Sequence, residues 1–376
     1  MGTVTLVIGG DLFPRDKQEI FARGKTEELF SKEIIELFCQ SDFSICNLEG
    51  ALTDAEEKSH KCGPSLKAAP ETIHGIKNLS LDYVTLANNH ITDYGTKGYA
   101  DTIKTLEENG IGFFGGGLNS DSIQTHISFS IKEKLFVIYA VSETVFNIPD
   151  EKTAGVNLYD EYLVCKELKE LKSRCDYLIV LYHGGAEYFP YPTPWIRRRF
   201  HRMADNGADI IIAQHSHCIG TKENYNGAYL LYGQGNFRFV QQDHPNLTNQ
   251  GLLLEFTFSE DGFEVKHHLV TTVEGMTVLD AKQDLSDFNE RNERLAKGDT
   301  FEEEYSAYSE KWMTKWLIEF RGFKYSELLL RRLLSQKKLT LFLRKKYKDV
   351  TVLRMLEHVR GEEDVEVMIQ GLEDFY

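Results

Sequence analysis

Short apolar runs alternate with amphipathic stretches along the first three quarters of the chain. Each run is short and rich in β-branched or aromatic residues, which is typical of a strand. The strands predicted in this way are 3–8, 43–46, 83–86, 111–114, 135–141, 177–181, 210–213, 228–232 and 252–258. Between several of them the apolar positions recur every three or four residues, which indicates helices over 31–41, 96–110, 161–175 and 195–207. This alternation of strands and helices predicts an α/β fold.

The pattern changes near residue 280. Just before this point, residues 252–270 surround an Asp-Gly pair with strand-like sequence, which predicts a β-hairpin. Beyond it the sequence is highly charged, helix-prone and poor in strand signals. We therefore predict an α/β domain over 1–279 and a helical C-terminal extension over 280–376. Within the extension, residues 311–348 hold 12 Lys or Arg and two acids, a net charge of +10.

Composition narrows the class of protein. The chain has 376 residues, of which 41% are hydrophobic, so a large core is expected. Its formal net charge of −15 argues against a nucleic-acid partner, because nucleic-acid binders present a basic surface. The six cysteines are scattered without a CxxC pair, which favours reduced thiols. We find no basic leader and no apolar run of ~18 residues, and therefore expect a cytoplasmic protein.

Polar side chains that can bind metals or carry protons follow the predicted strands. They are Asp11, Asn47, Glu49, Asn88, Asn89, His90, His183, His215, His217 and Asn236. The carboxyl ends of strands in an open α/β sheet share one edge, where ligands collect. Taken alone, each residue is better explained as a turn residue or a hydrogen-bonded polar group. Crowded at one edge, carboxylates and imidazoles need a compensating cation, so we predict a metal centre.

The types of side chain indicate which metals suit the site. Carboxylate and amide oxygens come from Asp11, Glu49 and Asn89, and imidazole nitrogens come from His183, His215 and His217. Mixed nitrogen and oxygen ligation favours Mn, Fe or Zn. Six ligands exceed the need of one tetrahedral zinc and suit two divalent ions. If residues 215–217 are extended, both histidines point to the same side of the strand.

The order of the motifs GD, NLEG, LANNHITDYG, HGGAEY, QHSH and GQGNF resembles the CapA-type poly-γ-glutamate capsule-biosynthesis family, within the calcineurin-like metallophosphoesterase superfamily. The resemblance covers residues 4–240. It implies a four-layer fold, in which two packed sheets are flanked by helices, and a site for two metals at the strand ends. It also implies that Asp11 and His217 bind the first metal, that Glu49 bridges both, and that Asn89, His183 and His215 bind the second. His90 would then be the catalytic histidine.

One position departs from the superfamily pattern. Most members open with Asp-x-His, whose histidine binds the first metal, whereas this chain has Phe13. CapA-type sequences commonly share this change, and also the glutamate at the bridging position. The first metal is therefore expected to have fewer protein ligands than the second. The remaining polar residues of these motifs, expected to contact substrate, are Asn47, Asn88, Glu187 and Asn236.

Two functions are compatible with these residues. In the first, metals activate water for attack on a phosphoester, His90 protonates the leaving oxygen, and Asp93 holds the imidazole in the required tautomer. In the second, the protein is not an enzyme but a polymer-binding or membrane-surface assembly factor, and residues 311–348 bind an anionic polymer, the polymer-synthesis machinery or the cytoplasmic leaflet. Arginines 197–199 are candidates for anion contact, although a solvated helix face explains them better. We find no nucleophile elbow and no phosphate-binding glycine loop.

Overall fold

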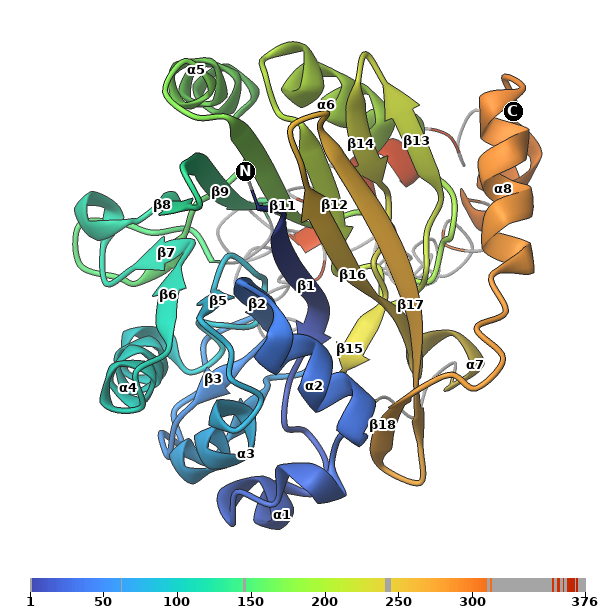
Figure 1. Ribbon diagram of the computed structural model, residues 1–376. Coiled ribbons are helices and arrows are strands. Elements are labelled where there is room, and N and C mark those ends of the chain that lie inside the picture. Colours follow the sequence, from blue (N-terminus) through green and yellow to red (C-terminus); the bar gives the residue numbers. More distant parts are fainter. Residues whose placement is uncertain are drawn as a thin grey trace, which may run out of the picture. The chain divides into compact units, whose positions relative to one another are not determined.

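A computed structural model describes residues 2–61, 63–144, 147–240 and 245–309, and, further along the chain, residues 312, 354, 357–358, 361, 364–368 and 370. The chain divides into two compact units, Met1–Ser59 with Ser65–Thr300, and His60–Pro64 with Phe301–Tyr376. The elements labelled β1 to α8 lie in the first unit (Figure 1). This unit includes residues 280–300, which the sequence analysis assigned to the extension, and the assignment of 280–376 as a separate domain stays a prediction. Apart from Trp312, the basic stretch 311–348 lies outside the described residues.

In the described part of the chain, the first sheet has eight strands in the order β18-β17-β16-β1-β2-β5-β6, with β15 paired to the end of β1. β1 runs parallel to β2 and antiparallel to β16. The predicted hairpin is confirmed as β16 and β17, which pair antiparallel. The strands are β1 (Val4–Leu12), β2 (Phe43–Leu48), β5 (Tyr83–Thr85), β6 (Gly112–Phe114), β15 (Asn236–Arg238), β16 (Gln250–Phe258), β17 (Phe263–Val273) and β18 (Met276–Leu279).

The second sheet, again counting described residues, has six strands in the order β13-β14-β12-β11-β9-β8. Its central strands β9, β11, β12 and β14 are parallel, which brings their carboxyl ends to one edge. The strands are β8 (His126–Ile131), β9 (Lys134–Ser142), β11 (Tyr177–His183), β12 (Ile210–Gln214), β13 (Lys222–Tyr225) and β14 (Ala228–Leu231). Two short ribbons pair β3 (Ala51–Leu52) with β4 (Lys67–Ala68) and β7 (Gly116–Gly117) with β10 (Gly155–Val156).

The two sheets pack face to face through one apolar cluster. Leu6 and Ile8 of β1 belong to the same cluster as Ile138 of β9 and Ile179 of β11. Val7, between them on β1, belongs instead to a second cluster with residues of the helices. Because side chains alternate along a strand, β1 is buried on both faces, as its unbroken apolar run requires.

Helices cover the outer face of each sheet. Ile34 and Phe38 of α2 lie in the cluster behind the first sheet, whereas α5 and α6 contact β11 and β12 of the second. In Figure 1, α1 to α4 (blue to cyan) and α5 and α6 (green) lie on different sides of the strands. The predicted four-layer α/β fold is therefore confirmed. The helices are α1 (Gln18–Ala22), α2 (Lys32–Gln40), α3 (Ile73–Lys77), α4 (Gly95–Glu108), α5 (Glu161–Lys172), α6 (Pro194–Asp205), α7 (Pro245–Thr248) and α8 (Ser286–Ala296).

Two further expectations from the sequence concern the cysteines and membrane-spanning helices. The five described cysteines are all free thiols, as expected. None of the described helices combines the length and apolar composition that crossing a bilayer requires.

Candidate metal centre

The strand ends meet where β2 and β15 flank β1. Asp11 lies in register with Asn47 on β2 and with Asn236 on β15. β1 was predicted to end at residue 8, but it continues past Asp11 because β15 gives its last residues a second partner. At Gly10 a Cβ would lie 2.3 Å from the carbonyl oxygen of Gly235, so the close approach of the two strands requires glycine there. Three polar residues therefore lie side by side across the sheet.

Two overlapping groups of buried side chains have the geometry to hold metal ions. They are Glu49 with His183 and His215, and Asp11 with Glu49 and His217. Within each group the ligand atoms all lie within 4.8 Å of one another. Glu49 belongs to both groups, which is the bridging position that the resemblance implies for it. The structure thus brings together five of the six predicted ligands in these two groups.

Glu49 is fully buried at the centre of both groups. Among the described residues, neither of its carboxylate oxygens has a hydrogen-bond donor. Burial raises the pKa of Glu49 well above its ordinary value, and the charges of Asp11 and Glu187 raise it further. Burial also raises the pKa of Asp11, although His217 and Asn47 oppose the shift. Two buried acids without enough donors are costly, and a divalent cation supplies the missing charge, so these residues fit a metal ion.

Two of the site histidines are held neutral. Burial, together with the neighbouring histidines, lowers the pKa of His183 well below its ordinary value and that of His215 to about 3. A neutral imidazole offers the lone pair that a metal needs. His183 directs its Nε2 atom toward Oδ1 of Asn89, 3.0 Å away, and toward Oε1 of Glu49, 3.6 Å away. Asn89, the sixth predicted ligand, therefore lies next to the others.

His215 and His217 are close together, but not for the predicted reason. An extended segment was expected, whereas β12 ends at Gln214 and φ is 89° at His215 and 52° at His217. Left-handed backbone is uncommon for residues with a side chain and costs about 1–3 kcal/mol each. The N–H of His215 donates to Oδ2 of Asp11 at 3.1 Å, which anchors this turn to β1. The turn leaves the two ring centroids 5.9 Å apart.

Of the residues expected to contact substrate, Asn47 and Asn88 are fully buried. The side-chain amide of Asn47 donates to Oδ1 of Asp11 at 2.8 Å, and that of Asn88 donates to Oδ1 of Asn47 at 3.0 Å. In this structure these amides orient the Asp11 carboxylate and do not face solvent. Glu187 has a side chain that is 38% exposed, and its contact with a substrate stays a prediction.

Phe13 occupies the position where the superfamily has a metal-binding histidine. Its ring is buried and packs so closely on Gly50 that a Cβ there would lie 2.5 Å from the ring. It also contacts Phe239, which stacks on His217 with ring centroids 5.1 Å apart. Asn236, another expected substrate contact, is buried with its Oδ1 atom 2.9 Å from Nδ1 of His217. Phe13 and Phe239 therefore form an apolar wall on one side of the first metal position that the resemblance implies. The side-chain amide of Asn236 orients His217 beside this wall.

His90 is buried beside the two groups. Its Nδ1 atom lies 2.7 Å from Oδ2 of Asp93, the contact expected from the sequence. Asp93 is itself fixed, because its Oδ2 accepts the N–H of Leu66 at 2.7 Å. The backbone N–H of His90 donates to Oδ1 of Asn88 at 3.0 Å, which ties the histidine to the orienting amides. With Nδ1 facing a carboxylate, Nε2 is the atom expected to transfer the proton, and this catalytic role stays a prediction.

One acid near the site, Glu143, was missed by the sequence analysis. It directly follows β9, as the predicted site residues follow their own strands, and this position after a strand is the signal that could have identified it. Its side chain is 6% exposed, and its Oε1 atom lies 3.6 Å from Nε2 of His215.

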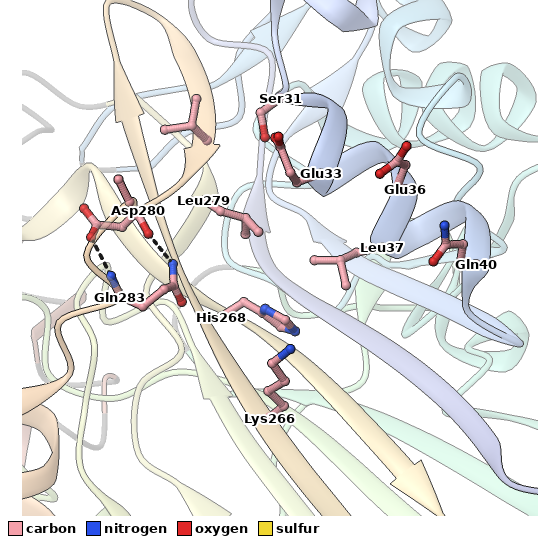
Figure 2. A pocket seen from close by; sticks show the side chains of 12 residues that line it. Ser31, Glu33, Glu36, Leu37, Gln40, Lys266, His268, Leu279, Asp280 and Gln283 are labelled. Carbon is pink, nitrogen blue, oxygen red and sulfur yellow. Dashed lines mark hydrogen bonds between the residues drawn. The ribbon is translucent and has the colours of Figure 1, made fainter.

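Two regions outside the strand ends do not join the site. Arg197 forms a two-pronged ion pair with Glu223, and buried Arg199 donates to the hydroxyl of Tyr182 at 2.7 Å. A pocket of about 700 Å³ lies between α2 and the β17–β18 hairpin, where Gln283 and Asp280 are hydrogen-bonded at its rim (Figure 2). None of the residues that line it belongs to the two metal-binding groups.

Comparison with known proteins matches nearly the same residues as the resemblance found in the motifs, 4–240. A family model described as "Bacterial capsule synthesis protein PGA_cap" matches residues 5–241. The capsule biosynthesis protein CapA of Bacillus anthracis is 28% identical over 254 residues, which cover 64% of this chain and 60% of that protein. The PGA biosynthesis protein CapA of Bacillus subtilis (strain 168) is 28% identical over 239 residues, which cover 61% and 62%.

The match thus spans about 60% of the length of these curated relatives. Among solved structures, a phosphatase of Mycoplasma pneumoniae aligns at 15% identity and a TM-score of 0.46, covering 77% of this chain and 99% of its own.

Proposed function

The chain belongs to the PGA_cap family of bacterial capsule synthesis proteins, and on this premise we propose that it is a metal-dependent phosphoester hydrolase acting in capsule polymer biosynthesis. Its substrate in this proposal is a phosphorylated or polyanionic compound of the poly-γ-glutamate or polysaccharide type. The activity is of the metallophosphoesterase kind that the motif order resembles. Two divalent ions, Mn, Fe or Zn, complete the site.

The observation that carries the proposal is the Glu49 carboxylate. It is fully buried, lacks hydrogen-bond donors within the described residues, and is surrounded by ligand atoms of Asp11, His183, His215 and His217. A buried charge with neither donor nor counter-ion is far more costly than a paired one. Divalent cations remove that cost and explain why two neutral imidazoles face it.

The residues divide into holding and reacting groups. Asp11 and His217 would hold one ion, Asn89, His183 and His215 the other, and Glu49 both. Bound ions would lower the pKa of a water molecule to near neutrality and neutralise charge on the phosphate.

The reacting group in the proposed chemistry is His90. It gives a proton to the leaving oxygen from Nε2, while Asp93 fixes Nδ1 at 2.7 Å. Glu187, partly exposed near the site, contacts the substrate.

A direct test uses the full chain with Mn²⁺ and two chromogenic esters, p-nitrophenyl phosphate and its bis-ester. We expect hydrolysis that is lost in Asp11→Ala and in His215→Ala. His74→Ala, which removes an exposed histidine of α3, is the matched control and should behave as wild type. Inactivity of wild type on both esters, with metal bound, would favour the rival function.

His90 gives a sharper test of catalysis. Proton transfer from a positioned group typically supplies about 10²–10⁴-fold, so His90→Ala should lower turnover by a factor in this range. Metal content should remain that of wild type, because His90 is a proton donor and not a ligand in this proposal. An equal loss of metal and turnover would make His90 structural.

The rival function is polymer or membrane-surface binding without catalysis. It depends on residues 311–348, whose net charge of +10 suits a polyanion or the anionic cytoplasmic leaflet. A cytoplasmic location, peripheral to the membrane, remains part of both proposals.

A further inference from the structure

His215 has two ring nitrogens in different surroundings. Nδ1 is buried and has no hydrogen-bond partner among the described residues. Nε2 faces two carboxylates, with Oε1 of Glu143 at 3.6 Å and Oε1 of Glu187 at 4.0 Å. A neutral imidazole carries one proton, and nearby negative charge favours the nitrogen that faces it. The proton therefore belongs on Nε2, and Nδ1 keeps the lone pair.

We propose that Glu143 is a positioning residue that fixes the tautomer and orientation of His215, so that Nδ1 is the atom offered to the metal. Metal-binding histidines commonly present their second nitrogen to a carboxylate in this way. Glu143 acts through His215 and is not itself a ligand, since it is absent from both groups whose ligand atoms converge. The inference rests on the proposed function, because it requires that the site binds metal.

The carboxylate of Glu143 is held in place by the backbone after His183. The Glu143 N–H donates to the carbonyl of His183 at 3.0 Å, and the N–H of Gly185 donates to Oε2 of Glu143 at 3.2 Å. The carboxylate lies so close to Gly184 that a Cβ there would be 2.8 Å from Oε2. Two consecutive glycines thus seat an acid at the end of β9. Glu187, on the same loop, is 38% exposed, so its influence on His215 is screened by solvent.

The distance of 3.6 Å exceeds a hydrogen bond, so the contact acts through charge in this structure. In a buried, low-dielectric setting such an interaction still biases which nitrogen is protonated. Glutamine at position 143 keeps the shape and an acceptor oxygen but loses the charge. Because the contact acts through charge, glutamine should lose most of the effect, as alanine does.

The test titrates Mn²⁺ into metal-free full-length protein by calorimetry, and follows Co²⁺ binding by its visible absorption, which reports loss of an imidazole ligand. Removing a carboxylate behind a metal-binding histidine typically weakens metal affinity about 10–100-fold, and we expect Glu143→Ala to weaken one of the two sites by this amount. Glu143→Gln should weaken binding nearly as much as Glu143→Ala, and Glu187→Gln should change affinity less than either. Glu108→Ala, on the exposed face of α4, is the neutral control.

The outcomes separate the two proposals. If wild type binds no metal, the proposed function fails and this inference fails with it. If wild type binds metal and Glu143→Ala binds as tightly, with an unchanged Co²⁺ spectrum, only the positioning role is overturned, even where the variant melts earlier. If Glu143→Gln binds metal as tightly as wild type, the charge of Glu143 has no effect and the positioning role is again overturned.

Discussion

Two glutamates of this protein lie in polar clusters of opposite kinds. Glu223, on β13, accepts hydrogen bonds from Arg197 and from the hydroxyl of Tyr232 and lies 3.1 Å from Nε2 of His201. Burial works against its ionisation, but these partners lower its pKa to about 2. Glu49 is more deeply buried, has no donor within the described part of the chain, and has a pKa raised well above its ordinary value.

The difference separates an acid that the protein itself satisfies from one that the described residues leave without a hydrogen-bond donor. The Glu223 cluster contains its own positive charge, so it is complete without any ligand. The Glu49 cluster contains a second acid, Asp11, while His183 and His215 are held neutral, so the partners of Asp11 do not offset both acids. Lone-pair donors that converge on a buried acid, with no arginine or lysine to pair with it, indicate a missing cation.

The largest effect is expected when Glu49 is changed to glutamine. Metal binding stabilises a folded protein by about 2.7 kcal/mol at 100 times the dissociation constant and about 4 kcal/mol at 1,000 times. Glu49→Gln should lose this stabilisation, because the shared ligand of both groups is neutralised. Thermal melts with and without Mn²⁺ measure the effect.

Glu223→Gln is the matched control, since it makes the same chemical change in the self-sufficient cluster. Its metal-induced shift should equal that of wild type. A Glu49→Gln protein that keeps the full shift would contradict the metal site.

An effect of similar size is expected when the complete cluster is broken. Glu223→Ala leaves Arg197 without its partner, and breaking a buried ion pair costs about 3–5 kcal/mol. We expect about 3 kcal/mol, the lower end of that range, because the Arg197 side chain is 28% exposed. Urea unfolding of the metal-free protein measures it. Lys97→Ala, which breaks an exposed pair with Asp101, should cost less than about 1 kcal/mol.

The sequence predicts the Glu49 cluster better than the Glu223 cluster, and the reason is physical. The residues of the Glu49 cluster follow apolar strands, and the carboxyl ends of such strands share an edge, so the sequence indicates that these residues lie close together. Glu223 lies on Lys222–Tyr225, an edge strand with too few apolar residues to be recognised. Its partners on α6 are fixed by tertiary packing, which no local pattern encodes. For this reason the sequence pattern favoured a solvated helix face for arginines 197–199.

Within the metal site, the sequence identifies residue types but not directions. Asn47 and Asn88 follow strands just as Asn89 does, yet they are fully buried and orient Asp11. The direction in which an amide points depends on backbone register, which composition does not fix. The turn at His215 is a similar case, because its left-handed backbone depends on the anchor that Asp11 provides.

The smallest effect concerns pH and distinguishes the two glutamates by sign. Glu49 has a folded-state pKa raised above its ordinary value of 4.5, so its contribution to stability is present below pH 4.5 and is lost as the pH rises toward the folded pKa. Glutamine at position 49 stays neutral, so its contribution to stability does not fall as the pH rises. In metal-free protein, Glu49→Gln should therefore gain stability relative to wild type, by up to about 1.4 kcal/mol between pH 5 and pH 6.

Glu223 has a lowered folded-state pKa, so its contribution is present above pH 4.5 and is lost only as the pH falls toward about 2. The stability difference between wild type and Glu223→Gln should therefore stay constant from pH 5 to pH 6. Urea unfolding of wild type and both variants, with chelator present, at the two pH values measures the difference. Equal pH dependence of the two variants would mean that Glu49 is as well satisfied by the protein as Glu223, and the physical reason for placing a metal between the strand ends would be lost.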